Sequence, residues 1–71
     1  MNLTSAQWGL LAHSDQVGWF SASTLEDQAE CVELWSMKLL ELQLQGARVG
    51  YTITDKGSQV AAALARRYLQ P

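Results

Sequence analysis

The sequence predicts a small α+β domain in which a helix, a short strand, a second helix, a β-hairpin and a last helix follow one another. Three observations carry this prediction: a capping pattern before each of the first two helices, two alternating apolar segments on either side of Gly46-Ala47, and an alanine-rich stretch after them. A hydrophobic fraction of 48% with 17% charged residues is typical of a folded chain. The 71 residues suffice for one domain, residues 1–71, with a thin core.

The first helix is expected to start after Thr4, because Gln7 three residues later completes the spacing of a capping box. Trp8 and Leu11 then lie on one face at helical spacing. We expect this helix to fade near His13-Ser14, where polar residues begin.

The next segment, residues 17–20, is short and aromatic, which is typical of a brief strand beside the hairpin. Gly18 weakens that interpretation, because glycine is unfavourable inside a strand. The sequence therefore leaves open whether this segment joins the sheet. Ser21-Ala22-Ser23 is a connector that ends in a second cap, since Ser23 and Glu26 repeat the capping-box spacing.

The second helix is expected over residues 24–39, where no glycine or proline interrupts the chain. We expect one helix of about four turns. The alternative is two helices with no residue that marks the turn between them. Two sets of residues run along this stretch at helical spacing. The first is Leu25, Ala29, Val32, Trp35, Ser36 and Leu39, and the second, an additional apolar edge, is Cys31, Leu34 and Met37.

Two six-residue segments alternate apolar and polar residues on either side of Gly46-Ala47. Folding the chain there brings all the apolar residues to one face of a hairpin, as a period of two requires. Glycine at the first position of a two-residue loop is the requirement of a type II′ turn. The expected pairs are Gln45 with Arg48, Leu44 with Val49, Leu42 with Tyr51, and Leu40 with Ile53.

The last helix is expected to start near Thr54 or Asp55. Its alanine-rich centre has high helix propensity and allows another element to approach closely. Residues at spacings of three and four form one face: Gly57, Val60, Ala61, Leu64 and Tyr68.

Two segments of the chain resemble a known pattern. Residues 3–11, Leu-Thr-Ser-Ala-Gln-Trp-Gly-Leu-Leu, resemble the first winged-helix element of the multiple-antibiotic-resistance regulator family, which often reads Leu-Thr, two variable residues, Gln and an apolar residue. Residues 51–57, Tyr-Thr-Ile-Thr-Asp-Lys-Gly, resemble the end of the wing in that family. Small winged-helix proteins of phages and prophages look similar at both ends. The resemblance implies a winged-helix-like fold and a role in transcriptional regulation.

Charge is divided unevenly between the two halves of the chain. Residues 1–37 carry five acidic residues and no Lys or Arg, which gives −5, whereas residues 38–71 carry a charge of +3. Complementing helix dipoles would also explain this division. The candidate nucleic-acid contacts are Lys38, Arg48, Lys56, Arg66 and Arg67, and the candidate partner contacts are Trp19, Phe20, Glu26, Asp27, Glu30 and Glu33.

A protein partner or self-association is favoured over DNA. A helix that reads DNA carries Arg, Lys, Asn or Gln on its exposed face, whereas the helix expected before the hairpin is acidic. The alternative is a DNA-binding transcriptional regulator that places Arg48 in a minor groove and uses the basic second half of the chain. Both functions are non-enzymatic and belong to a bacterial or phage binding module.

The sequence contains no recognisable catalytic motif. With one histidine, His13, and one cysteine, Cys31, the chain lacks a zinc ligand set, and it has no glycine-rich phosphate loop. We therefore expect no enzyme activity, cofactor, metal or small-molecule substrate. A single cysteine and the lack of a signal peptide or membrane-spanning stretch predict a cytoplasmic protein without a membrane partner.

Overall fold

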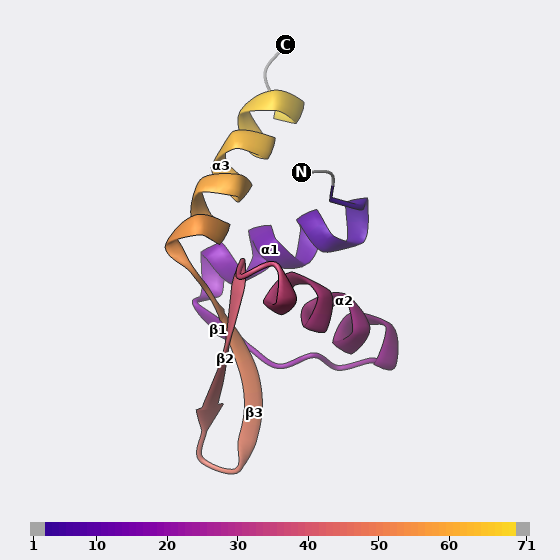
Figure 1. Ribbon diagram of the computed structural model, residues 1–71, viewed down its shortest axis with the longest axis vertical. Helices are drawn as coiled ribbons and strands as arrows, with labels where there is room; N and C mark the ends of the chain where they lie inside the picture. Colours follow the sequence, from indigo (N-terminus) through magenta and orange to yellow (C-terminus); the bar gives the residue numbers. More distant parts are fainter. Residues whose placement is uncertain (1–2, 70–71) are drawn as a thin grey trace.

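The computed structural model describes residues 3–69 as three helices and a three-stranded antiparallel sheet, which confirms the predicted α+β fold class. In chain order the elements are α1 (Ser5–Val17), β1 (Trp19–Phe20), α2 (Leu25–Ser36), β2 (Leu40–Gln45), β3 (Arg48–Ile53) and α3 (Asp55–Leu69). The helices gather at one end of the sheet and the β2–β3 hairpin projects away from them (Figure 1). The molecule is consequently elongated and measures 43 × 21 × 18 Å.

The start of α1 follows the predicted capping box. The Thr4 side chain accepts a hydrogen bond from the Gln7 backbone N–H at 3.1 Å, and Gln7 Oε1 accepts one from the Thr4 N–H at 3.1 Å. The expected end near His13-Ser14 is wrong, because α1 continues to Val17. The Ser14 side chain is fully buried, so polarity did not mark the helix end here. Gly18, with φ 85°, closes the helix by donating to the Ser14 carbonyl.

A single helix, α2, forms between β1 and β2, so the alternative of two helices is wrong for this chain. Its cap is Thr24 and not Ser23, since Thr24 Oγ1 accepts a hydrogen bond from the Asp27 N–H at 3.0 Å. The helix also ends at Ser36, three residues earlier than expected.

Lys38 ends α2 because it adopts the left-handed conformation, with φ 63°. The Leu39 N–H donates to the Leu34 carbonyl at 3.0 Å, and the Lys38 N–H donates to the Trp35 carbonyl at 2.9 Å. This pair of bonds is the Schellman arrangement, which glycine usually supplies. Leu34 and Leu39 are both fully buried, and they provide the apolar contact that accompanies this motif.

The hairpin has the predicted register at every expected pair, from Gln45 with Arg48 to Leu40 with Ile53. Gly46 has φ 62° and Ala47 has a negative φ, as a type II′ turn requires. The short strand also forms, over Trp19–Phe20 only, and it pairs with β3 so that the sheet order is β1-β3-β2.

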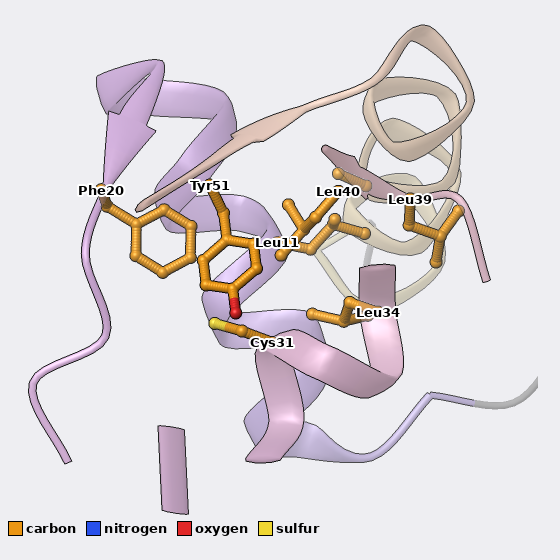
Figure 2. Close-up of a cluster of buried hydrophobic side chains, with 8 residues drawn as sticks. Leu11, Phe20, Cys31, Leu34, Leu39, Leu40 and Tyr51 are labelled. Carbon is orange, nitrogen blue, oxygen red and sulfur yellow. The ribbon is translucent and has the colours of Figure 1, made fainter. Parts of the chain in front are cut away.

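The core lies between α1, α2 and the end of the sheet that is away from the hairpin turn (Figure 2). Phe20 is buried there, with its ring 5.7 Å from that of His13 and 6.1 Å from that of Tyr51. α2 faces the core through Cys31 and Leu34, whereas Leu25, Val32 and Trp35 of the same helix are exposed. The buried apolar residues are Leu11, Phe20, Cys31, Leu34, Leu39, Leu40, Tyr51 and Ala61.

α3 begins at Asp55, as predicted, and the Thr54 side chain accepts a hydrogen bond from the Gly57 N–H at 3.0 Å. Gly57 lies against the Leu39 carbonyl so closely that a Cβ would collide with it. Ala61 of the expected apolar face is buried, and Val60 packs at the edge of the core. The side chain of Tyr68 lies outside the described residues.

Candidate protein-binding surface

The far half of the hairpin exposes three large apolar side chains. Leu42 is 49% exposed, Leu44 64% and Val49 49%. The register places Leu44 opposite Val49, and Leu42 opposite the buried Tyr51, so these side chains lie on the face that carries the core further up the sheet. The helices cover only the near end of that face (Figure 1).

A second exposed apolar stripe runs along α2. It consists of Leu25, Val32 and Trp35, which are 89%, 44% and 49% exposed and share one side of the helix at spacings of seven and three residues. Cys31 and Leu34 bury the other side of the same helix. A helix with two apolar edges can turn only one of them toward a small core.

A hydrogen bond to Tyr51 joins α2 to the hairpin. Gln28 of α2 donates a hydrogen bond from Nε2 to the Tyr51 hydroxyl at 2.9 Å. Gln28 precedes Val32 by one helical turn, and Tyr51 is directly opposite Leu42 in the sheet. We call the combined set the apolar surface: Leu25, Val32, Trp35, Leu42, Leu44 and Val49.

The opposite face of the hairpin is covered by Trp19. Its indole lies against Gly50, where an added Cβ would collide with the ring, and its Nε1 donates to the Gln43 carbonyl at 2.9 Å. The Arg48 guanidinium carbon lies 5.5 Å from the centre of the Trp19 ring, within cation–π range. Of the two aromatic partner candidates, Trp19 is thus half-buried against the sheet, and the expectation of an accessible Phe20 is wrong because that ring is in the core.

The acidic candidates on α2 do not form one open patch. Glu26 and Glu33 are exposed, whereas Asp27 and Glu30 are half-buried. Glu33 Oε2 accepts a hydrogen bond from Gln7 Nε2 at 2.7 Å and so joins α2 to α1. Burial raises the pKa of the Cys31 thiol from 9.0 to about 11, and the nearby carboxylates of Asp27 and Glu30 add to this effect.

The cationic candidates are all exposed, and they are distributed along the length of the molecule. Arg48 stands at the tip of the hairpin, whereas Arg66 and Arg67 are in the last turn of α3, at the opposite end of the long axis (Figure 1). Lys38 and Lys56 lie between these ends, in the turn after α2 and the first turn of α3. The structure therefore does not gather the five cations on one surface.

A groove of about 320 Å³ runs between α1 and α3, and among the described residues that line it Asp15 is the ionisable one. Asp15 Oδ1 accepts a hydrogen bond from Ser58 Oγ at 3.0 Å. Within residues 3–69, no group of three His, Cys, Asp or Glu side chains is placed to hold a metal ion. No helix in the same range is long and apolar enough to cross a bilayer. The other groove residues are Trp8, Ala12, Gln16, Ala61, Ala62 and Ala65.

Sequence reasoning did not identify the hairpin leucines and Val49 as surface residues. A signal was present, since each hairpin strand is six residues long and a chain of this size has too little core to cover both strands fully. No protein-family model matches the chain, and no characterised protein was found to be a relative. Function is therefore argued from the surface itself.

Proposed function

We propose that this chain is a non-enzymatic, winged-helix-like binding module of bacterial or phage origin. It acts through protein–protein contacts in transcriptional regulation or phage–host interaction. The observation that carries this proposal is the apolar surface, whose six large side chains are between 44% and 89% exposed. Exposed apolar patches, such as the one formed by Leu44 and Val49 directly opposite each other, mark interaction sites in small proteins.

The position of α2 supports a protein partner. In a winged-helix arrangement the helix that directly precedes the hairpin is the one that enters the DNA major groove. Here that helix holds no Lys or Arg between Leu25 and Ser36, and its exposed side carries Val32, Trp35 and two glutamates. Such a surface repels phosphates and favours an apolar partner.

Site-specific photo-crosslinking in the native host tests this proposal. A photoreactive amino acid at position 32 or 35 is expected to link the chain to another protein molecule. The same probe at Gln59, an exposed position on α3, is the matched control and is expected to form no adduct. The absence of adducts at both α2 positions, or equal labelling at Gln59, would contradict a partner on the apolar surface.

Direct DNA binding is the second candidate, and Arg48 is the observation that favours it. Arg48 is exposed at the hairpin tip and its guanidinium is held over the Trp19 ring. An arginine presented on a wing is suited to a minor groove. Lys38 and Lys56 would add phosphate contacts.

Fluorescence anisotropy with random duplex DNA at about 50 mM salt separates the two candidates. Under the protein-partner proposal, no saturable binding is expected. DNA binding would instead appear as an affinity that falls steeply with salt and is lost in Arg48→Ala, while Arg67→Ala at the other end of the molecule leaves it intact. That second pattern would replace the protein-partner proposal.

A further inference from the structure

The free edge of the sheet is β2. Because the strand order is β1-β3-β2, one side of β2 pairs with β3 and the other pairs with nothing in the described chain. The other sheet edge, β1, is only two residues long, whereas β2 has six. Residues 41–45 are all exposed, so a partner strand can reach this edge.

Backbone groups of Leu42 and Leu44 point toward that open edge. A two-residue turn makes Gln45 and Arg48 a hydrogen-bonded pair, and such pairs alternate with non-bonded pairs along an antiparallel ladder. Leu44 and Val49 then form a non-hydrogen-bonded pair. The backbone N–H and C=O groups of Leu44 therefore point away from β3, and those of Val49 point away from β2. The Val49 carbonyl confirms this direction, since it accepts a hydrogen bond from Ser21 Oγ on the far side of β3.

The usual protections against edge pairing are missing from β2. It contains no proline, no lysine and no bulge, and its register with β3 is continuous over all six residues. Its one charged residue is Glu41. Its exposed leucines add an apolar face beside the open backbone groups.

We propose that the occupant of this edge is a second copy of the chain, whose β2 pairs antiparallel with the first across a two-fold axis at Gln43. In this register Leu42 of each copy lies opposite Leu44 of the other, and their outward backbone groups form the new hydrogen bonds. The result is one continuous six-stranded sheet. This inference rests on the proposed function, because the joined sheet brings together the hairpin parts of two apolar surfaces.

The β2 edge is complementary to itself, which favours a second copy of the chain as its partner. Residues directly opposite in an antiparallel pair share a face, so the exposed leucines and Val49 of both copies form one apolar surface on one side of the joined sheet. On the other side, Glu41 of one copy is opposite the neutral Gln45 of the other, so no like charges oppose each other. Arg48 lies on that same side, next to Gln45 in the sheet, and attracts the partner's Glu41.

The pairing is expected to be reversible. Four main-chain bonds and a few apolar side chains bury less than the roughly 800 Å² per partner of a standard stable interface. The dimer is therefore expected to dissociate into monomers on dilution and to be populated at about 1 mM.

Disulfide trapping tests the register. In the proposed dimer the two Gln43 residues form a non-bonded pair with Cα atoms about 4.5 Å apart, which suits a disulfide. Gln43→Cys is therefore expected to form a covalent dimer under mild oxidation. Gln45→Cys is the matched control, because its two copies lie about 13 Å apart along the strands. Cys31 does not compete, since its side chain is fully buried.

Covalent dimer from Gln43→Cys alone supports the proposal. Equal linking of both variants, linking of Gln45→Cys alone, or linking of neither would overturn it. If neither links, photo-crosslinking from positions 32 and 35 still decides the proposed function separately, because those residues lie on α2 and not on the β2 edge.

Sedimentation equilibrium of the full chain gives a second measurement. Leu44→Lys places a charge opposite the partner's Leu42. Because a charge on an edge strand opposes pairing, the dimerisation constant is expected to fall at least about tenfold. Val17→Lys is the control, because Val17 is 52% exposed at the end of α1, just before β1 at the opposite edge of the sheet. A wild-type chain that stays monomeric at about 1 mM would overturn the proposal, as would equal weakening by both substitutions.

Discussion

Gly50 lies on the hairpin face opposite the core, where it makes room for Trp19. Its lack of a side chain lets the Trp19 indole lie flat on β3, where it bonds the Gln43 carbonyl and supports Arg48. Gly50→Ala is expected to displace the indole and lower the free energy of unfolding by about 1–3 kcal/mol, the usual cost of overpacking. Urea denaturation measures this loss.

Gly9 offers the opposite case on α1. A Cβ there meets no atom within 4 Å, and the residue is exposed inside a helix. Gly9→Ala therefore serves as the control and is expected to raise the free energy of unfolding by about 0.5–1 kcal/mol. If both alanine substitutions changed stability alike, Trp19 would not be packed on Gly50 as described.

The Cys31 thiol links stability to pH. Burial raises its pKa to about 11 in the folded chain, whereas the unfolded chain ionises near 9.0. Between these values only the unfolded state releases the proton, so stability is complete below pH 9 and falls as the pH rises to 11. The loss is at most about 3 kcal/mol.

This component is measured by comparing urea unfolding of the wild type and Cys31→Ala between pH 8 and 11. Tyrosine and lysine titrate in both proteins, so the difference between the two curves isolates the thiol. We expect the wild type to lose its advantage over Cys31→Ala as pH rises. Parallel curves would show that Cys31 is not desolvated in the folded chain.

At the scale of elements, the end of α2 stores strain at Lys38. A residue with a side chain at φ 63° costs about 1–2 kcal/mol relative to a right-handed conformation, and glycine avoids that cost. Because glycine also has more freedom in the unfolded chain, Lys38→Gly is expected to stabilise the fold by about 0.5–1 kcal/mol in urea denaturation. Lys56→Gly, in the first turn of α3, is the control and should destabilise by up to about 1 kcal/mol. A loss of stability in Lys38→Gly would contradict the Schellman ending.

The hairpin was predictable from sequence because its information is local. The alternation around Gly46-Ala47 determines strand, turn and register together. The orientation of α2 was not predictable, because both of its apolar edges have helical spacing and only contact with α1 and the sheet decides between them. Its end was equally hidden, since Lys38 occupies a position where a sequence normally shows glycine. The orientation of α2 determines which of its apolar residues are exposed. The α2 part of the apolar surface could therefore not be predicted from the sequence alone.

At the scale of the whole molecule, the arrangement separates a packed end from a projecting one. Leu11, Leu34 and Tyr51 hold the helices on the near half of the sheet, and the hairpin tip extends beyond them (Figure 1). Residues with few buried neighbours open at lower free energy than the core. The hairpin tip is therefore held mainly by its β2–β3 ladder and by Trp19, and pairing along β2 would add support where the helices give none.

Amide hydrogen exchange resolved by residue tests this division and the direction of the β2 backbone together. In dilute solution the Gln43 N–H faces β3 and should exchange at least about tenfold more slowly than its neighbours Leu42 and Leu44, whose N–H groups face water. The Leu11 and Leu34 amides should be slower still, because they exchange only on global unfolding. Raising the protein concentration should slow Leu42 and Leu44 selectively, since edge pairing covers those two groups and leaves Gln43 unchanged. A Leu44 amide as protected as Gln43 in the dilute monomer would show that the ladder alternates the other way, and the two-fold axis at Gln43 would then be wrong.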